Sequence, residues 1–248
     1  MRTNDDQDGV TASIVGSGLI ARAFEPHRAA LGDACVYAAG VSNSACTDVR
    51  EFERERQRVL AALAQLHPHT LFMYFSTCSV HDPAAQASGY VRHKLAMEQL
   101  VAQRARHLVL RLPQLAGNTP NPHTLLNYLY ARIVRSERFS IWRGAHRNII
   151  DVDDVARIAT DLVANEQAAG ETINIANTRN CSIFEVVECM QEVLGHQAIF
   201  DIIESGAGYA IDTHRIQASL SRCDVGFAGD YLHRTIRKYY GHHDPSAP

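Results

Sequence analysis

The chain has 248 residues, of which 46% are hydrophobic and 21% are charged, and its formal net charge is -3 at pH 7. These are ordinary values for a globular protein, and they provide ample chain for a hydrophobic core. The nearly neutral charge predicts no general attraction to nucleic acid or to a membrane surface, and no run approaches the roughly 20 apolar residues of a membrane span.

The cysteines and histidines do not follow a metal-binding pattern. Six cysteines lack a CxxC or other ligand spacing, and thirteen histidines lack an accompanying carboxylate–histidine pattern. We therefore predict no metal site. Cysteines that read as reduced thiols, and polar first residues without the apolar core of a signal peptide, favour a cytoplasmic protein. We expect residues 1–9 and 241–248 to form disordered tails.

A glycine-rich turn follows the first predicted strand, which covers residues 10–15. Its sequence is Gly16-Ser17-Gly18-Leu19-Ile20-Ala21, and a helix continues to about residue 31. Strand, G-x-G-x-x-A and helix is the layout of a dinucleotide-binding turn, because the glycines permit the turn and let the backbone approach a pyrophosphate. We predict nucleotide contacts along residues 16–20. The alternative interpretation is a tight turn that binds nothing.

The next predicted elements are a strand at residues 34–39 and a charged helix at residues 47–65. The helix carries an apolar stripe that includes Phe52, Val59 and Leu63, which is typical of a surface helix with one face on the core. Its alternating segment REFERERQR is interpreted as a solvated face.

Proton-transfer groups meet around the third predicted strand. The apolar run at residues 71–75 ends in small polar residues that include Thr77, as expected where a buried parallel strand reaches the carboxyl edge of a sheet. Tyr90 and Lys94 stand one helical turn apart at the start of a helix at 90–103, so phenol and ammonium share one face. An ammonium beside a phenol lowers its pKa, and the Thr77 hydroxyl can hold the reacting oxygen. These three residues are the predicted catalytic set.

The second half of the chain continues the alternation of strands and helices. We predict strands at 107–112, 139–142 and 199–203, and helices at 124–136, 155–165 and 231–240, with a capping box at Ser182 and Glu185. Residues 10–165 are expected to form a nucleotide-binding core, and residues 166–240 a smaller substrate-binding lobe.

Thr77 after a strand and Tyr90-x-x-x-Lys94 on a helix resemble the short-chain dehydrogenase/reductase superfamily, and more narrowly its extended NAD-dependent epimerase/dehydratase branch, which modifies nucleotide sugars. The resemblance implies an α/β, Rossmann-like doubly wound parallel sheet with a small C-terminal lobe. It also implies NAD or NADP as cofactor, a nucleotide-sugar substrate, and a homodimer formed by the helices near 47–66 and 90–103. Lys94 would hold the nicotinamide ribose while Tyr90 exchanges a proton with the sugar.

Further segments carry the resemblance. VYAAGVSNS is similar to the family strand that lines the cofactor, LVLRLPQLAG to a strand and turn beside the nicotinamide, and GAHRNIIDVDDV to a block whose arginine grips the diphosphate. The resemblance implies cofactor contacts at Ala39, Gly40 and Pro113, and substrate contacts at Ser42, Cys78, Gln114, Arg147 and Arg215. For Arg111 we prefer a salt bridge, and for Asp153-Asp154 a helix N-cap and first turn.

The chain departs from the family pattern at its adenosine side. Two strands that normally follow the first helix are missing, and Asp33 precedes the next strand instead of ending it. Residues 34–39 are therefore either the second strand or the fourth strand of a sheet that has lost its outer edge. The Ala-Ala-Gly ending favours the fourth strand, although this strains the usual right-handed crossover.

Two further departures from the family pattern narrow the range of reactions that this site is expected to catalyse. The asparagine of the family's tetrad, expected near Phe52, is absent, and Cys78-Ser79 replaces the Asp-Glu pair of dehydratases. We therefore predict an epimerase or 4-ketoreductase and argue against dehydration. The alternatives are a non-redox enzyme with Tyr90 or His81 as acid/base, and a binding protein that kept the fold without dinucleotide binding.

Overall fold

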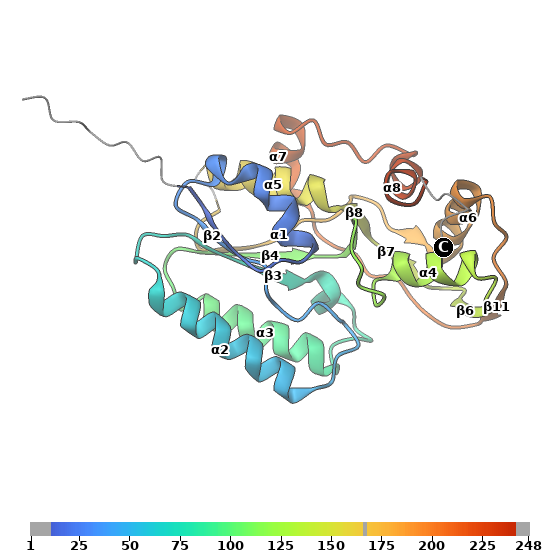
Figure 1. The fold of residues 1–248 in the computed structure, drawn as a ribbon, viewed down its shortest axis with the longest axis horizontal. Coiled ribbons are helices and arrows are strands. Elements are labelled where there is room, and N and C mark those ends of the chain that lie inside the picture. The colour runs from blue at the N-terminus through green and yellow to red at the C-terminus, as the bar shows by residue number, and fades with distance from the viewer. Residues whose placement is uncertain (1–10, 166–167, 242–248) are drawn as a thin grey trace, which may run out of the picture.

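A five-stranded parallel sheet forms the centre of the computed structural model, which describes residues 11–165 and 168–241. The strand order is β1-β2-β3-β4-β9, with bounds β1 Ser13–Val15, β2 Cys35–Tyr37, β3 Phe72–Thr77, β4 His107–Leu112 and β9 Glu171–Asn174 (Figure 1). The predicted α/β fold with a parallel sheet is confirmed. The predicted tails lie outside the described residues, apart from Gly241.

Helices cover both faces of this sheet. The helices α2 (Val49–Gln65) and α3 (Gly89–Val101) lie on one face, and α1 (Leu19–Phe24) and α5 (Val152–Ala164) lie on the other (Figure 1). Alternate side chains of a strand point to opposite faces. Phe72 and Tyr74 of β3 accordingly pack toward α2 and α3, whereas Met73 and Phe75 pack toward α1 and α5.

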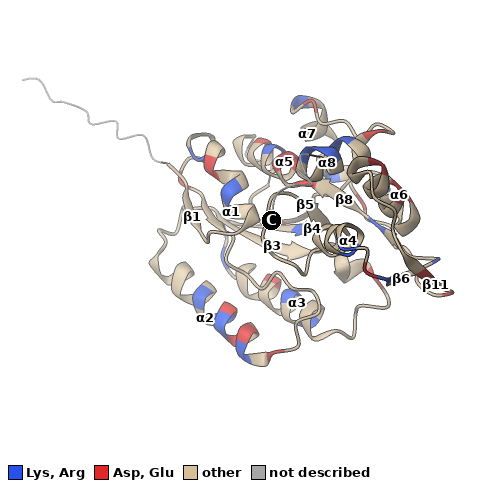
Figure 2. Ribbon diagram, turned by 45° about the vertical axis from the view of Figure 1, so that its right-hand side comes forward, with Lys and Arg blue, Asp and Glu red and all other residues tan. Residues whose placement is uncertain are grey.

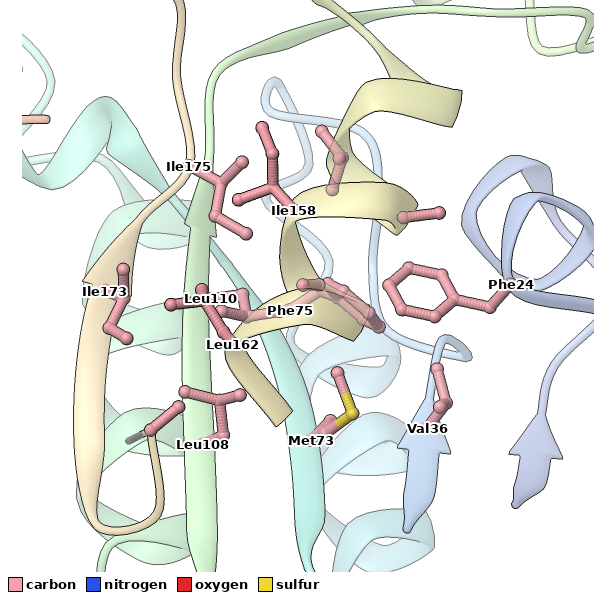
Figure 3. Packing of buried hydrophobic residues seen from close by; sticks show 14 of the residues in the cluster. Phe24, Val36, Met73, Phe75, Leu108, Leu110, Ile158, Leu162, Ile173 and Ile175 are labelled. Atoms are coloured by element: carbon pink, nitrogen blue, oxygen red, sulfur yellow. The ribbon is translucent and has the colours of Figure 1, made fainter. Parts of the chain in front are cut away.

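The larger core lies between the sheet and the α1–α5 face. Phe24 of α1, Phe75 of β3 and Ile158 of α5 meet there (Figure 3). Because both faces of the sheet are buried, the strands are nearly continuous apolar runs, and all six residues of β3 are buried.

The order of strands decides between the two interpretations of residues 34–39. In a Rossmann sheet the first strand lies beside the fourth, in the order 3-2-1-4-5-6. Here β2 is hydrogen-bonded between β1 and β3, so it takes the fourth strand's place and β1 becomes the sheet edge. Because β2 lies between β1 and β3, the connections from β1 to β2 and from β2 to β3 move across the sheet in the same direction. The helices in these two connections, α1 and α2, nevertheless lie on opposite faces of the sheet. The two connections therefore have opposite hands, as expected if two strands were removed between them.

A second cluster packs beside the carboxyl edge of the sheet (Figure 1). It contains three helices, α4 (Leu125–Val134), α6 (Ile183–Leu194) and α8 (Tyr231–Tyr240). It also contains three short strand pairs, which are β6 (Phe139–Trp142) with β11 (Phe200–Ile203), β7 (His146–Arg147) with β10 (Cys181–Ser182), and β5 (Gln114–Ala116) with β8 (Ile149–Asp151).

The chain enters this cluster more than once. The strand β9 and the helix α7 (Gln217–Arg222) lie C-terminal to residue 165, but Ile173 and Leu220 belong to the main core. Leu126 and Ile133 of α4 precede residue 165, but they pack in the second cluster. The single boundary at residue 165 is therefore corrected: the lobe is built from two stretches of chain, because β9 must return to complete the sheet beside β4.

Some helix ends match the predictions made from the local sequence, and others differ from them. Ser182 and Glu185 form the predicted capping box. At α5 the N-cap is Asp151, one turn ahead of the predicted start, and its carboxylate accepts from the Asp153 N–H at 2.9 Å. The helix predicted to residue 31 breaks after α1 into short 3-10 turns at Glu25–His27 and Ala29–Leu31, because Pro26 cannot donate a helical hydrogen bond. Further 3-10 turns are Cys78–His81 and His214–Ile216.

Charged side chains of both signs are spread over the helices, most densely along α2 (Figure 2). Arg54 pairs with Glu51 and Arg56 pairs with Glu53, with Glu51 partly exposed and the other three exposed, so this part of the segment is the solvated face that the sequence predicts. Within residues 11–165 and 168–241, the helices lack the combination of length and apolar character that crossing a bilayer requires.

Candidate active site

A cavity of about 540 Å³ opens at the carboxyl edge of the main sheet. This edge, beside a glycine-rich turn, is where open α/β sheets bind ligands. Its volume falls in the range of small-molecule and cofactor sites, roughly 300 to 1,000 Å³. The glycine turn, the ends of β2, β3 and β4, and the first turn of α3 line it. The lining thus brings together residues from distant parts of the chain.

The glycine turn is shaped by the backbone of the strand beside it. Gly16 has φ +123°, a conformation that favours glycine, and an added Cβ would lie 2.6 Å from the Ala38 carbonyl oxygen. Gly18 is the N-cap of α1, and an added Cβ would meet no atom within 4 Å. The first glycine is therefore required by the fold, whereas the second leaves open space above the turn.

Thr77 and Tyr90 are brought together as the sequence predicts. Thr77 ends β3, and Tyr90 lies in the first turn of α3, whose N-cap Ser88 accepts from the Val91 N–H at 3.1 Å. The Thr77 hydroxyl lies close enough to Tyr90 to oppose the rise of the Tyr90 pKa. Both residues line the cavity, so an oxygen atom of a ligand could reach both hydroxyls.

Lys94 lies one turn further along α3 and is only 2% exposed. Its ammonium donates to Glu55 Oε1 at 3.1 Å, to Tyr74 Oη at 3.0 Å and to the Phe75 carbonyl at 3.3 Å. An ammonium has three N–H donors, so these contacts occupy all of them. Lys94 lines the cavity, but its charge is held inside the protein.

Glu55 is the functional residue that the sequence interpretation missed. It was assigned to the solvated face of α2, yet it is 2% exposed. Its carboxylate accepts from Tyr74 Oη at 2.6 Å and from the Val41 N–H at 2.7 Å, and it contacts Lys94 and His93. Its burial could have been predicted from its spacing. Glu55 lies three residues after Phe52 and four before Val59, which places its carboxylate within the apolar stripe of the helix.

Electrostatics at the site differ from the sequence expectation. Burial opposes the charge of Glu55, but the hydrogen bond to His93, the charge of Lys94 and further bonds outweigh it and lower the Glu55 pKa to about 2. Burial raises the pKa of Tyr90 well above its usual value, Glu55 raises it further, and the Thr77 hydrogen bond opposes them. The expected lowering of the Tyr90 pKa by Lys94 is therefore corrected, because Glu55 compensates the ammonium.

Most of the other predicted site residues line this cavity. They are Gly16, Ser17, Gly18, Leu19, Ile20, Ala39, Gly40, Ser42, Pro113 and Gln114. The glycine turn, the segment after β2 and the turn after β4 therefore surround the same cavity. Their roles in binding a cofactor or a substrate stay predictions.

Three predicted substrate contacts lie off the cavity lining. Cys78 is buried, and its thiol donates to the Arg111 carbonyl at 3.3 Å. Arg215 pairs with Glu171 at 2.7 Å, at the amino end of β9. Arg147 lies in β7 and donates to the His146 carbonyl at 2.8 Å.

The remaining sequence assignments concern residues beside the cavity. Arg111 forms the preferred salt bridge, donating to Glu98 at 2.6 and 2.9 Å. His81 contacts the Asn174 side chain at 3.1 Å and lies off the lining, so its position does not favour it as an acid/base group. In the described ranges, no group of three or more His, Cys, Asp or Glu side chains is arranged to hold a metal ion.

Tyr209 also lines the cavity, and it comes from a segment for which no motif or periodic pattern predicts a site residue. Residues 204–213 contain no regular helix or strand, and Asn180 Nδ2 holds this segment through the Tyr209 carbonyl at 2.8 Å. Burial raises the Tyr209 pKa, while a hydrogen bond with Ser79 and the charge of Arg147 oppose this. Arg147 is thus near enough to Tyr209 to influence its pKa. Polar residues of the loop after β5, among them Asn121 and His123, line the same side.

The sequence of residues 33–176 matches the NAD dependent epimerase/dehydratase family. The chain belongs to this family. The match covers more than half of the chain and begins two residues before β2. It does not include the glycine turn, whose assignment depends on the geometry described above. A comparison with curated proteins gave no match.

Solved structures show the same fold. RMD from Pseudomonas aeruginosa complexed with NADPH is 16% identical, with a TM-score of 0.68 over 92% of this chain and 99% of that chain. The dTDP-glucose 4,6-dehydratase from Bacillus anthracis in complex with NAD is 18% identical, with a TM-score of 0.66 over 82% and 71%. The UDP-glucose-4-epimerase from Stenotrophomonas maltophila, with bound NAD and formylated UDP-arabinopyranose, is 18% identical, with a TM-score of 0.65 over 89% and 79%. At these identities the likeness establishes the fold.

Proposed function

We propose that this protein is an NAD(P)-dependent epimerase or 4-ketoreductase that acts on a nucleotide-activated sugar. One observation carries the proposal: Thr77, Tyr90 and Lys94 meet the glycine turn in a single cavity. A proton-transfer group beside a nucleotide-binding turn is the arrangement that hydride chemistry on a sugar hydroxyl or ketone requires.

The residues around the cavity fit a nicotinamide dinucleotide. The open space above Gly18 admits a pyrophosphate against the backbone, and Pro113 and Lys94 lie on the cavity wall toward Tyr90. Solved proteins of the same fold are described in complex with NAD or NADPH. A bound nicotinamide would supply or accept the hydride, which no side chain of this chain can do.

The chain's own residues supply placement and the proton. The Tyr90 hydroxyl exchanges a proton with the substrate oxygen, and the Thr77 hydroxyl, which lines the same cavity, orients that oxygen. The ion pair of Lys94 and Glu55 sets the electrostatic environment of the Tyr90 phenol. Burial of Tyr90, which is 8% exposed, keeps bulk water from competing for that proton.

Polar groups of the cavity wall are proposed to hold the nucleotide sugar. Ser42, Gln114 and Tyr209 line the cavity, and hydroxyl and amide groups suit a sugar with many hydroxyls. Arg147, whose charge acts on Tyr209, is proposed to bind the diphosphate, because a guanidinium fork pairs well with phosphate oxygens. The UDP-glucuronic acid 4-epimerase from Bacillus cereus, 18% identical, is described in complex with UDP-glucuronic acid and NAD.

A second candidate function is favoured by the shortened sheet. The strand β1 is an edge, and Asp33 is exposed at the amino end of β2, away from the cavity. An acidic residue at a strand end normally binds the adenosine ribose, and this chain lacks that support. A nucleotide-sugar-binding protein or non-redox enzyme on the same scaffold is therefore the alternative.

One experiment separates these functions. Purified protein is titrated with NADH and NADPH, then supplied with 4-keto nucleotide sugars while consumption of the reduced cofactor is followed. The proposed function predicts saturable dinucleotide binding and turnover with at least one keto sugar. Binding of a uridine or thymidine diphosphate sugar, without binding of either dinucleotide, would select the alternative.

We also propose a cytoplasmic homodimer. The helices α2 and α3 lie side by side on one face of the sheet (Figure 1), and Val49 and Leu95 are exposed apolar residues on them. A second copy could cover this face. Light scattering of the purified protein tests the dimer, and a monomer at micromolar concentration would contradict it.

A further inference from the structure

The buried contact between Glu55 and Lys94 carries an inference that rests on the proposed function and refines it. We propose that Glu55 is a positioning residue that holds Lys94 and keeps Tyr90 in its proton-donating form, which fits this site to the reduction of a ketone. The family resemblance predicts the opposite effect, in which an unpaired lysine favours the phenolate.

The Glu55 carboxylate is built into the fold by four donors from three other segments. The Val41 N–H reaches it from the loop after β2, Tyr74 Oη reaches it from β3, and His93 and Lys94 reach it from α3, at 2.6 to 3.1 Å. A buried carboxylate is stable only when its oxygens are satisfied in this way. The number and convergence of these contacts indicate a dedicated site for a negative charge.

The glycine after β2 provides room for the pair. A Cβ on Gly40 would lie 2.6 Å from Glu55 Oε1 and 2.9 Å from Lys94 Nζ. Any other residue there would push the carboxylate or the ammonium aside. The backbone at position 40 is therefore matched to the ion pair beneath it.

The position of Lys94 explains the effect on Tyr90. Its Nζ lies 3.1 Å from Glu55 Oε1, but 5.9 Å from the centroid of the Tyr90 ring. A carboxylate this close to the ammonium cancels most of its field at the phenol, because opposite charges at short separation act as a dipole. Tyr90 then experiences burial without a net positive charge, and burial favours the neutral phenol.

Other ionisable groups surround this pair, and the cation Arg58 lines the same cavity. Tyr74 of β3 and Tyr37 of β2 approach Glu55 from the sheet, and their pKa values are raised, with burial as the largest cause. Arg58 of α2 acts on Tyr37, and Glu98 of α3 acts on Lys94. His93, on α3, shares the Glu55 carboxylate. Among these charged groups, Glu55 acts on the Tyr90 pKa in the direction that favours the neutral phenol.

The step that this state serves is reduction. A hydride from a reduced nicotinamide dinucleotide forms a C–H bond at the carbonyl carbon, while the C=O π electrons form an O–H bond with the Tyr90 proton. The ketone is reduced to an alcohol, the dinucleotide is oxidised, and the phenolate is reprotonated from solvent. A neutral Tyr90 holds the required proton before the substrate arrives, whereas epimerisation must begin by removing one.

A direct titration of Tyr90 tests the inference without substrate or cofactor. A fluorinated tyrosine is placed at position 90, because fluorine makes the phenol more acidic and brings its titration into an accessible pH range, and its ¹⁹F signal is followed with pH. We expect the residue in the wild-type background to be at least about tenfold less acidic than the free fluorinated amino acid. A residue as acidic as the free amino acid, or more acidic, would overturn the inference.

The variant Glu55→Gln supplies the second arm. It should make the fluorinated residue at least about tenfold more acidic than in the wild-type background, because Lys94 is then uncompensated. Glu53→Gln, an exposed change on the same helix, is the matched control and should leave the titration unchanged. If the fluorinated residue titrates at the same pH in Glu55→Gln as in the wild-type background, the proposed role of Glu55 is overturned. If this variant fails to fold, the wild-type comparison with the free amino acid still decides.

The readout separates this inference from the proposed function. If the titration behaves as expected but neither dinucleotide binds, the electrostatic role of Glu55 stands and the redox function fails. If keto sugars are reduced but Tyr90 titrates as a strong acid, the function stands and the role of Glu55 fails.

Discussion

The Lys94 ammonium donates to the Glu55 carboxylate at 3.1 Å, in a position where both side chains are almost completely buried. Buried ion pairs add little stability on average, because desolvation offsets most of their attraction. Removing one partner is costly, because it leaves the other charge buried and unpaired. The pair therefore constrains the site more than it stabilises the fold, and it ties α2 to the helix that carries Tyr90.

The first prediction concerns Tyr90→Phe. Loss of a general acid typically costs about 10²- to 10⁴-fold in rate, so we expect kcat for keto-sugar reduction to fall by at least about a hundredfold. The affinity for the reduced dinucleotide should change little. Steady-state kinetics and a binding titration check both values. Tyr128→Phe, at a half-exposed surface tyrosine on α4, is the control, and unchanged turnover in Tyr90→Phe would exclude the phenol as the acid.

The second prediction concerns stability in acid. Glu55 has a folded-state pKa of about 2, against an ordinary value of 4.5. A carboxylate with a lowered folded-state pKa contributes stability above its unfolded-state pKa and loses it as the pH falls through the folded-state value. The stability advantage of the wild type over Glu55→Gln should therefore shrink between pH 4.5 and about 2, by up to about 3 kcal/mol. Urea unfolding at several pH values measures it, and a constant difference would contradict the lowered pKa.

The third prediction contrasts the two glycines of the turn. Gly16→Ala introduces a Cβ at φ +123° and 2.6 Å from the Ala38 carbonyl oxygen, so we expect a loss of about 1–3 kcal/mol in the free energy of unfolding. Gly18→Ala meets no atom within 4 Å and should stay within about 0.5 kcal/mol of the wild type. Its added methyl should nevertheless weaken dinucleotide binding by about tenfold or more. Thermal unfolding and a cofactor titration of both variants check the contrast, which fails if Gly18→Ala binds the dinucleotide as tightly as the wild type.

The fourth prediction tests the packing of Gly40 against the ion pair. Gly40→Ala should destabilise the protein by about 1–3 kcal/mol, because the methyl group overlaps Glu55 and Lys94. The effects of Gly40→Ala and Glu55→Gln should not add, with a coupling of about 0.5 kcal/mol or more in a double-mutant cycle. Gly89→Ala is the control, since its Cβ would lie 3.5 Å from Phe52, an ordinary contact. Additive effects of the two substitutions would show that Gly40 does not act on the pair.

The sequence predicts the parts of the site that are defined locally. Thr77 ends an apolar strand, and Tyr90 and Lys94 are one helical turn apart, so strand polarity and helical spacing place them together. The glycine turn is likewise a contiguous segment. In each case the residues that define the geometry are close in the sequence.

The parts that the sequence does not predict depend on contacts between distant segments. Glu55 is one of several alternating charges on α2, and only the packing of that helix against Tyr74 and Lys94 separates it from its exposed neighbours. Tyr209 lies in an irregular segment that is held by side-chain contacts from other parts of the chain. The place of β2 beside β1 follows from pairing, because the interval before it fits either of two strands.

A reduced nicotinamide dinucleotide is proposed to bind in the cavity between the glycine turn and Tyr90. A fluorescence titration of the wild-type protein with NADH and NADPH measures this binding. We expect saturable binding of at least one of them, with one molecule per chain and reversal by the oxidised cofactor. Titrations that show no saturable signal with either dinucleotide, on protein verified to be folded, would contradict it.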